Sequence, residues 1–271
     1  MRILAMWRYP VKSMLGERID EVDVDAAGLA HDRGLALIDS STGRVASAKH
    51  PRLWRDLLMY SAAVRDGRVE IVSPAGWTLD ATAPGVDGML SRDLGRPVRV
   101  ASERPEGATV ERPAPEDVLD RGVDADVHAA VLTIGRGSPG ASFVDSAPVH
   151  LITSATLDAV GVEGVRYRPN LVVETAPGTP AFVENDWVGR EVHIGGQGDA
   201  GIVLQVAKPT PRCAVPTLEH GPLPRAPQAV RTLMTANRVD VPEAGVVPCA
   251  GCYATVVRAG AVRVGDEVTL R

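Results

Sequence analysis

The chain has 271 residues, of which 45% are hydrophobic and 23% are charged, as in an ordinary soluble globular protein with one large or two modest domains. A formal net charge of −5 and the lack of a long basic run exclude a general nucleic-acid binder. The chain has no apolar run near the ~18 residues of a membrane span, no secretory cleavage site and an odd count of three cysteines, so we expect a cytoplasmic protein without a membrane partner.

Short runs of alternating apolar and polar residues recur along the chain and end at Gly, Asp or Pro, a pattern typical of β-strands. The clearest predicted strands, in chain order, are 21–24, 34–38, 68–72, 170–174, 191–194 and 201–206. Near the C-terminus, 253–257 and 262–264 are separated by the four residues 258–261, which predicts a hairpin.

Helical patterns are few. The best are 154–160, which Thr153 or Ser154 would cap, and 226–235. Many short strands with two or three helices predict a mainly β protein of the α+β class, built from β-barrel-like units and not from βαβ layers.

A change of composition at 103–117, rich in proline and acidic residues, divides the chain. Such a segment is a poor strand, and we interpret it as an exposed connection. It predicts a β-rich N-terminal domain over 1–112 and a β-barrel-like C-terminal domain over 113–271. The alternative is a long surface loop inside one domain.

Two segments match Gly-x-Gly-x-x-Gly, at 135–140 and 196–201. A dinucleotide-binding fingerprint needs a helix directly after the glycines. The first segment is followed by a non-helical stretch and the second by a predicted strand, so we interpret both as turns.

Basic residues with neighbouring polar groups recur at the ends of predicted strands. Lys12 precedes Ser13, Arg33 closes His-Asp-Arg, a lysine and an arginine lie within 47–53, and Arg168 begins Arg-Pro-Asn170. Lysine, serine and guanidinium donors suit phosphate or a similar oxyanion. Taken singly, each basic residue is better interpreted as a solvated strand end.

Arg212 and Cys213 follow the strand predicted at 201–206. Thiolate sulfur is a ligand for soft metals, and an adjacent guanidinium matches an anionic group carried by such a metal. The pair therefore points to a soft metal with an anionic ligand, and the basic residues upstream strengthen this interpretation.

Taken as an ordered set, eight motifs are distinctive: Tyr9–Ser13, His31–Arg33, Ala48–Leu53, Asp145–Ile152, Arg168–Val173, Phe182–Trp187, Arg212–Cys213 and Val264–Asp266. On these motifs the chain resembles the MOSC family, named for the C-terminal domain of molybdenum-cofactor sulfurase. It is most similar to the mitochondrial amidoxime-reducing component and its bacterial relatives. The resemblance covers nearly the whole chain and is thin between about 67 and 130.

The resemblance implies a β-rich MOSC-associated domain joined to a MOSC domain, with a molybdenum pterin cofactor between them. Matched motif by motif, Cys213 would be the thiolate ligand of molybdenum and the catalytic residue. The other residues implied to bind the cofactor are Lys12, Ser13, Arg33, Asp145, Ser146, Arg168, Asn170 and Arg212.

The chain departs from the family pattern at three places. Ala147 stands where the amidoxime reducers have a hydroxyl, and Asn185 replaces an acidic residue, although Asp186 follows it. Pro211 precedes Arg212 where a small polar residue is usual, which removes a backbone donor. These changes bear on the substrate more than on the cofactor.

Cys249 and Cys252 form a Cys-x-x-Cys motif for which the resemblance gives no role. Three interpretations remain open: two buried thiols, a reversible disulfide, or a zinc site completed by Cys213. Against redox activity, Cys252 leads into a predicted strand and not into a helix.

The resemblance implies a molybdenum-dependent oxidoreductase that reduces amidoximes and hydroxylamines. The chain ends without an iron–sulfur cysteine cluster, so a separate electron donor, such as a ferredoxin, a flavodoxin or a cytochrome with its reductase, is implied. The alternative is a non-catalytic carrier of molybdenum pterin or of sulfur as a Cys213 persulfide. The oligomeric state has no signal in the sequence.

Overall fold

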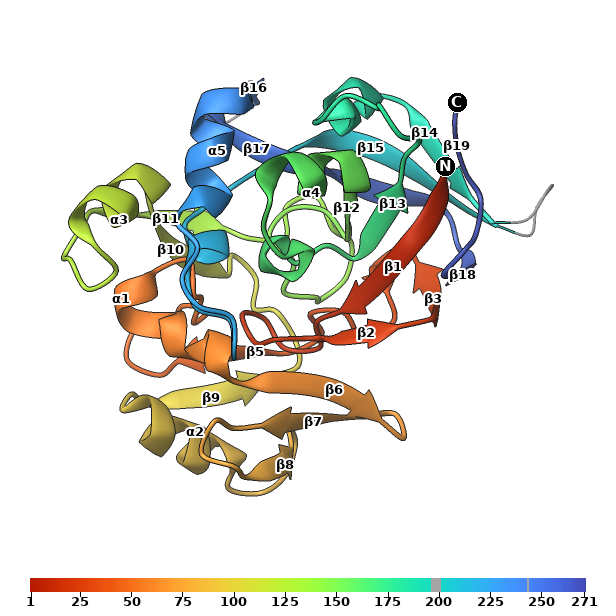
Figure 1. Ribbon diagram of the computed structural model, residues 1–271. Helices are drawn as coiled ribbons and strands as arrows, with labels where there is room; N and C mark the ends of the chain where they lie inside the picture. The colour runs from red at the N-terminus through yellow and green to blue at the C-terminus, as the bar shows by residue number, and fades with distance from the viewer. Residues whose placement is uncertain (196–200, 243) are drawn as a thin grey trace.

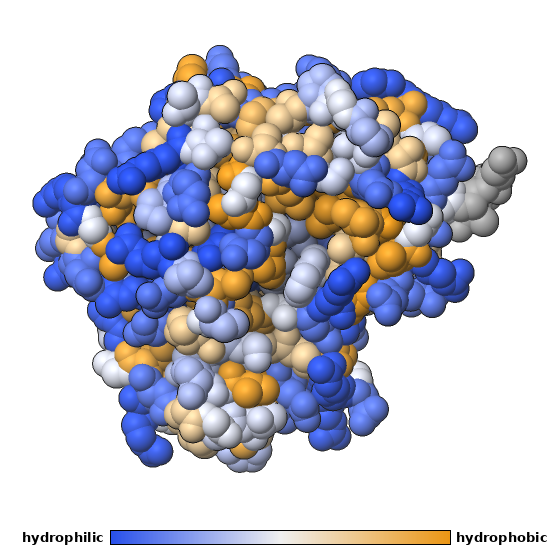
Figure 2. Space-filling model, viewed as in Figure 1, coloured by the Kyte–Doolittle hydropathy of each residue, from blue (hydrophilic) through white to orange (hydrophobic). Residues whose placement is uncertain are grey.

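The computed structural model describes residues 1–195, 201–242 and 244–271, and they form a mainly β protein with short helices (Figure 1). The predicted α+β class is therefore confirmed. Within these residues no helix combines the length and the apolar character needed to cross a bilayer. On the face shown in Figure 2, hydrophilic residues dominate the outer edge and apolar residues gather towards the middle.

The largest sheet occupies the upper part of Figure 1 and has nine strands in the described residues. Its order is β19-β14-β15-β17-β12-β13-β1-β2, with β16 paired to β17, and only β12 and β13 are parallel neighbours. The path is open, so this sheet does not close into a barrel. The strands are β1 Arg2–Arg8, β2 Glu17–Ile19, β12 Val149–Thr153, β13 Leu171–Glu174, β14 Glu191–Ile194, β15 Ile202–Pro211, β16 Arg238–Val241, β17 Gly245–Arg258 and β19 Val268–Leu270.

Both ends of the chain contribute to the same layers. β1 pairs with β13, so that Met6 lies opposite Leu171. β18 (Gly260–Arg263) pairs with β3 (Glu21–Asp25), which in turn pairs with β4 (Gly28–Leu29). The loop after β1 is thereby fixed beside β12 and β13 of the C-terminal half.

The large sheet buries side chains on both faces. Alternation along β12 sends Leu151 into a core shared with β3, β4 and β18, whereas Ile152 packs under α4 (Ser154–Val160) and α5 (Gln228–Ala236). Leu151 and Ile152 are both fully buried. A sheet covered on both faces gives the loops at its ends a rigid base.

A second core lies in the N-terminal part, in the lower half of Figure 1. Leu37, Leu57, Ile71 and Leu90 are fully buried there. Around it lie β5 Ala36–Asp39, β6 Ser61–Arg65, β7 Arg68–Val72, β8 Thr78–Asp80, β9 Val98–Ala101, α1 Pro51–Trp54 and α2 Val86–Leu94. Beyond it, β10 (Thr109–Pro113) and β11 (Ala129–Thr133) form a separate pair, and α3 (Pro115–Arg121) lies between them in sequence.

Several predicted elements are confirmed. The strands at 68–72 and 191–194 have the predicted bounds, and α5 covers most of 226–235. The helix at 154–160 is capped by Thr153, whose Oγ1 accepts a hydrogen bond from the Thr156 amide at 3.2 Å. No helix follows 135–140, as a turn requires, while most of 196–201 lies outside the described residues.

Two local predictions are wrong. Residues 109–113 form strand β10, because Pro113 is its last residue and the strand has a single partner, where a missing amide is tolerated. The hairpin at 258–261 does not form either. β17 pairs with β12 and β15, and β18 pairs with β3, because these strands have partners in both halves of the chain.

Candidate functional site

A cavity of about 500 Å³ lies at the ends of β12, β13, β15 and β17, where the N-terminal loops meet the central sheet. All nine residues singled out from the sequence line it: Lys12, Ser13, Arg33, Asp145, Ser146, Arg168, Asn170, Arg212 and Cys213. Residues that are up to 201 positions apart in sequence therefore share one wall. Their individual roles remain predictions.

The cavity concentrates positive charge. In the described part of the chain, its lining includes nine basic side chains and one carboxylate, although the whole chain has a net charge of −5. A concave site with charge of one sign focuses the field and attracts anions. The basic residues are Lys12, Arg33, Lys49, Arg112, Arg136, Arg166, Arg168, Lys208 and Arg212.

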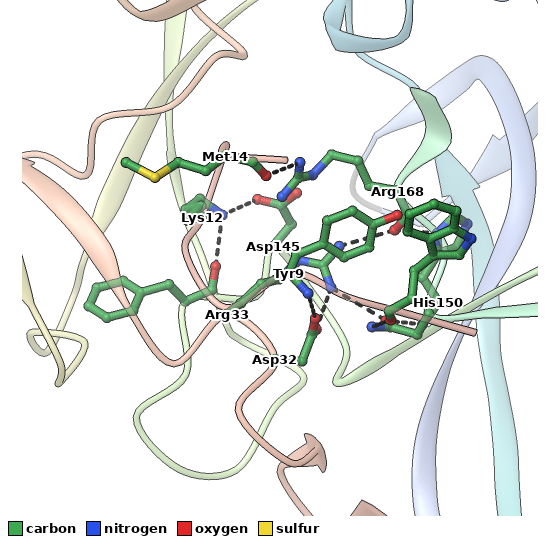
Figure 3. A network of polar contacts seen from close by, with 11 residues as sticks. Tyr9, Lys12, Met14, Asp32, Arg33, Asp145, His150 and Arg168 are labelled. Carbon is green, nitrogen blue, oxygen red and sulfur yellow. Dashed lines mark hydrogen bonds and ion pairs between the residues drawn. The ribbon is translucent and has the colours of Figure 1, made fainter. Parts of the chain in front are cut away.

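Asp145, the one carboxylate among the described lining residues, is held by two lysines, of which Figure 3 shows Lys12. Its Oδ1 lies 2.7 Å from the Lys12 Nζ and 2.9 Å from the Lys49 Nζ, and Lys12 also donates to the carbonyl of Phe143 at 2.8 Å. Burial favours the neutral acid, yet Lys12 and Lys49 together hold the pKa of Asp145 well below its usual range. Burial lowers the pKa of Lys12 to about 8, against the opposing effect of Asp145.

The lowered pKa of Lys12 predicts a pH effect on the ligand-free protein. Between pH 8 and 10.5 the unfolded chain binds a proton at Lys12 that the folded protein has released, so the free energy of unfolding rises with pH over this range. We expect a gain of up to about 3 kcal/mol. Urea unfolding at pH 7.5 and 9.5 measures it, and Lys12→Gln should remove this part of the pH dependence. An equal slope in both proteins would contradict the assignment.

Tyr9 lies between two guanidinium groups (Figure 3). The Arg33 and Arg168 guanidinium carbons lie 4.9 and 4.3 Å from the centre of its ring, as in cation–π contacts. Asp32 pairs with Arg33 and also accepts the Tyr9 amide at 2.8 Å. The Arg33 Nη2 donates to the carbonyl of Arg168 at 3.1 Å. Arg33 is thus charge-compensated and tied to the other half of the chain.

Arg168 is not compensated in the same way. Its Nη1 donates to the carbonyl of Met14 at 2.6 Å, and its buried Nη2 has no hydrogen-bond partner among residues 1–195, 201–242 and 244–271. Burial and the neighbouring Arg33 lower the pKa of Arg168 to about 10. A buried donor without a partner is costly, and an anion in the cavity would satisfy it.

The backbone is strained at three of these positions. Ser13, Arg33 and Arg168 have φ values of 67°, 49° and 53°, in the left-handed region that residues with a side chain seldom adopt. Each costs on the order of 1–2 kcal/mol. Strain that recurs around one cavity indicates that the geometry is held for a function.

Arg212 extends along the cavity wall with its donors satisfied by uncharged groups. It donates to the carbonyls of Ala250 and Tyr167 at 2.9 and 3.0 Å, and to His150 Nε2. Burial and Arg212 hold the pKa of His150 well below its usual range, so His150 is a neutral acceptor. Cys213, directly after Arg212, is a partly exposed free thiol in the lining.

Asn170 lines the cavity, but its side chain is largely used within the protein. Its Oδ1 accepts hydrogen bonds from the His150 amide at 3.1 Å and from Arg33 Nη1 at 3.4 Å. Its Nδ2 donates to the carbonyl of Trp7 at 3.4 Å. Ser13 is similar, since its Oγ accepts the Ala48 amide at 3.1 Å. Both residues hold neighbouring strands and loops in place.

The departures from the family pattern fall into two groups. Ala147 and Pro211 line the cavity, so they affect its shape directly. Asn185 and Asp186 do not line it: Asn185 donates to Asn237 at 2.8 Å, and Asp186 is exposed. The shift of a carboxylate from position 185 to 186 therefore brings no acid to the site.

Cys249 and Cys252 are buried free thiols on β17, in agreement with the first of the three interpretations. Burial raises the pKa of Cys249 to about 11 and that of Cys252 well above its usual range. Among the described residues no group of three His, Cys, Asp or Glu side chains could hold a metal ion. The zinc interpretation has no support there.

Sequence reasoning missed several lining residues. His150 lies inside the recognised Asp145–Ile152 motif but looks like one more position of a buried strand. Lys49 lies in 47–53, a segment with donors for an oxyanion, but the sequence does not single out this lysine. Lys208 and Tyr253 carry no local signal, because the pairing of β15 with β17 brings them together at the cavity, and Arg112 reaches it from the separate β10–β11 pair.

Comparison with curated proteins gives no match. Among solved structures, the YuaD protein from Bacillus subtilis matches with a TM-score of 0.45 and 12% identity, over 99% of this chain and 94% of that chain. YiiM from Geobacillus stearothermophilus matches with a TM-score of 0.31 and 14% identity, over 60% of this chain and 72% of that chain.

Comparison with protein families gives two matches that follow one another along the chain. The MOSC N-terminal beta barrel domain matches residues 1–91, and the MOSC domain matches residues 139–269. Together they cover the segments that carry Lys12, Arg168 and Cys213. The chain belongs to the MOSC-domain family.

Proposed function

We propose that the protein binds a molybdenum cofactor in this cavity and reduces N-hydroxylated compounds with electrons from a separate donor protein. The observation that carries the proposal is the buried Arg168 Nη2, which has no partner in the part of the chain that the structure describes, in a cavity lined by basic residues and a partly exposed thiol. The MOSC domain is associated with this cofactor, which agrees with the chemistry of the lining.

The donor set fits such a group. A pterin with a terminal phosphate would be an anionic ligand, and a cavity of about 500 Å³ has room for a ligand of that size. Arg168 and Arg212 would bind its anionic groups. Lys12 and Arg33 would add to the positive electrostatic potential around it. Cys213 would supply the soft thiolate ligand. The cofactor, when bound, supplies two-electron redox chemistry.

The reaction balances as R–NHOH + 2 e⁻ + 2 H⁺ → R–NH₂ + H₂O: the N–O bond breaks and the oxygen leaves as water. The two electrons come from the separate donor protein and the protons from solvent. The protein's part is to hold and orient the reactants and to keep a positive field around them.

Part of the cavity opening is apolar. Val131 and Leu132 on β11 line the cavity while remaining 49% and 38% exposed, so they lie at its mouth. Val241 and Pro242 are further apolar parts of the lining. Apolar walls near the entrance favour N-hydroxylated substrates with an apolar body over small, fully polar ones.

Replacing Leu132 tests this preference. We expect Leu132→Asn to raise the KM for an aromatic amidoxime by about tenfold with kcat nearly unchanged, because about 1.4 kcal/mol of apolar contact is lost at the rim. Val188→Asn is the matched control, since Val188 is 40% exposed and lies outside the cavity lining. An equal KM change in both variants would contradict the placement of the substrate.

Metal and pterin analysis of the full chain, produced in a host that makes the cofactor, tests the function. We expect molybdenum close to one per chain and turnover of an amidoxime or a hydroxylamine with a competent reductant. Stoichiometric molybdenum without any such turnover would refute the reaction. A persulfide on Cys213 without molybdenum would instead favour the alternative, a sulfur carrier.

A further inference from the structure

We infer that Glu184 is the counter-charge of Arg212 and holds it in the cavity wall through a single peptide group, the one that joins Ala250 to Gly251. Glu184 belongs to the short 3₁₀ helix Val183–Trp187 and is fully buried. It does not line the cavity, so it is a positioning residue and not a ligand.

The carboxylate of Glu184 is satisfied by three uncharged donors. One oxygen accepts hydrogen bonds from the hydroxyls of Thr153 and Thr156 at 2.9 and 2.8 Å. The other accepts the amide of Gly251 at 3.0 Å. In the described residues Glu184 has no direct ion pair, which is unusual for a fully buried carboxylate.

Arg212 meets the same peptide group from its other side. Its Nε donates to the carbonyl of Ala250 at 2.9 Å, and its Nη2 contacts that oxygen as well. Arg212 is only 7% exposed and, within the described part of the chain, has no carboxylate partner. Two buried charges of opposite sign thus lie at the two ends of one N–H and C=O pair.

This arrangement aligns the peptide dipole between the charges. The negative carboxylate lies at the N–H end and the positive guanidinium at the C=O end, and each polarises the peptide in the same direction. The hydrogen bond at either end is strengthened by the charge at the other, so the pair is coupled without touching. The coupling compensates Arg212, which lines the cavity, without placing a carboxylate there.

The backbone at this point is held in one conformation. Gly251 has φ +75°, and a Cβ there would lie 2.4 Å from the carbonyl of Leu151 and 2.5 Å from His150 Nε2. No side chain fits between β17 and β12 at this position. The orientation of the peptide is therefore fixed by Glu184 on one side and by close contact with β12 on the other.

A double-mutant cycle on the full chain tests the coupling, with the thermal midpoint of unfolding as readout. Glu184→Gln keeps the shape and removes the charge. We expect it to lower the midpoint by roughly 5–10 °C in the wild-type background, since it leaves Arg212 uncompensated. In the Arg212→Met background the same change should lower it by less than half as much.

The control is Glu17→Gln. Glu17 is also a shielded carboxylate with three donors, the amide of Val64 and the guanidinium groups of Arg8 and Arg65, and it contacts neither Arg212 nor the bridging peptide. Glu17→Gln should lower the thermal midpoint by the same amount in the wild-type and Arg212→Met backgrounds. Equal costs of Glu184→Gln in both backgrounds would overturn the proposal, because a residue that only anchors the 3₁₀ helix gives additive effects.

Failure to fold is also informative. If Glu184→Gln does not fold but the double variant does, the proposal is supported; if Arg212→Met folds and the double variant does not, it is overturned. Arg212→Gln replaces Arg212→Met if the latter is insoluble. None of these measurements needs bound molybdenum, so they are independent of whether the proposed function holds.

Discussion

Arg168→Met is expected to stabilise the ligand-free protein and to weaken anion binding at the same time. Methionine fills a similar volume and removes a buried, partly unpartnered guanidinium, so we expect the free energy of unfolding to rise by about 1–3 kcal/mol. The same change removes a charged donor from the cavity, which should lower the affinity for inorganic phosphate by roughly 10- to 100-fold. Urea unfolding and isothermal titration with phosphate measure the two effects.

Arg231→Met is the control for this prediction. Arg231 is exposed on α5 and lies outside the cavity lining. The change should leave both stability and phosphate affinity close to those of the wild type. A loss of stability in Arg168→Met together with unchanged phosphate affinity would mean that Arg168 serves the fold and not the ligand.

The opposite signs expected for Arg168 reflect how the site is built. Ser13, Arg33 and Arg168 adopt left-handed backbone conformations, and the last two place guanidinium groups on the two sides of the buried Tyr9. Strain, burial and like-charge proximity all disfavour the ligand-free state. An anionic ligand offsets the last two, so we expect the protein to gain stability when the cavity is filled.

Local sequence patterns were enough to predict elements that bury one face only. The helix over 154–160 has a capping threonine and an apolar stripe, and β7 alternates cleanly, so both were predictable from sequence. β17 was not. Its 14 residues pair with β12, β15 and β16, and β18 pairs with β3, which lies some 240 residues away in sequence. Pairing with distant strands therefore replaces the hairpin that the local sequence predicts.

The site shows the same division. Lys12, Arg168 and Arg212 stood out because each is adjacent to a distinctive neighbour in the sequence. Glu184 did not stand out as part of the site, because it acts through a peptide of another strand and has no contact with the cavity. Lys49 likewise shows its role only once Asp145 lies 2.9 Å away. Residues that act through a partner distant in sequence leave no pattern around themselves.

Cys213→Ala is expected to abolish retention of molybdenum while leaving much of the pterin bound. The Cys213 thiol is the one soft metal ligand in the described lining. Several basic side chains would bind the anionic part of the cofactor. We expect the molybdenum content to fall more than tenfold and the pterin content by less than half, as read by metal analysis and pterin fluorescence on the same sample.

Cys249→Ser is the matched control, because Cys249 is a fully buried free thiol on β17 that does not line the cavity. It should keep the wild-type ratio of molybdenum to pterin, even if stability decreases. Molybdenum retained in full by Cys213→Ala would show that this thiol is not the ligand. Pterin and molybdenum lost together would place the anchoring of the whole group on Cys213 and not on the surrounding arginines. The ratio of the two contents therefore separates a metal ligand from a residue that only shapes the cavity.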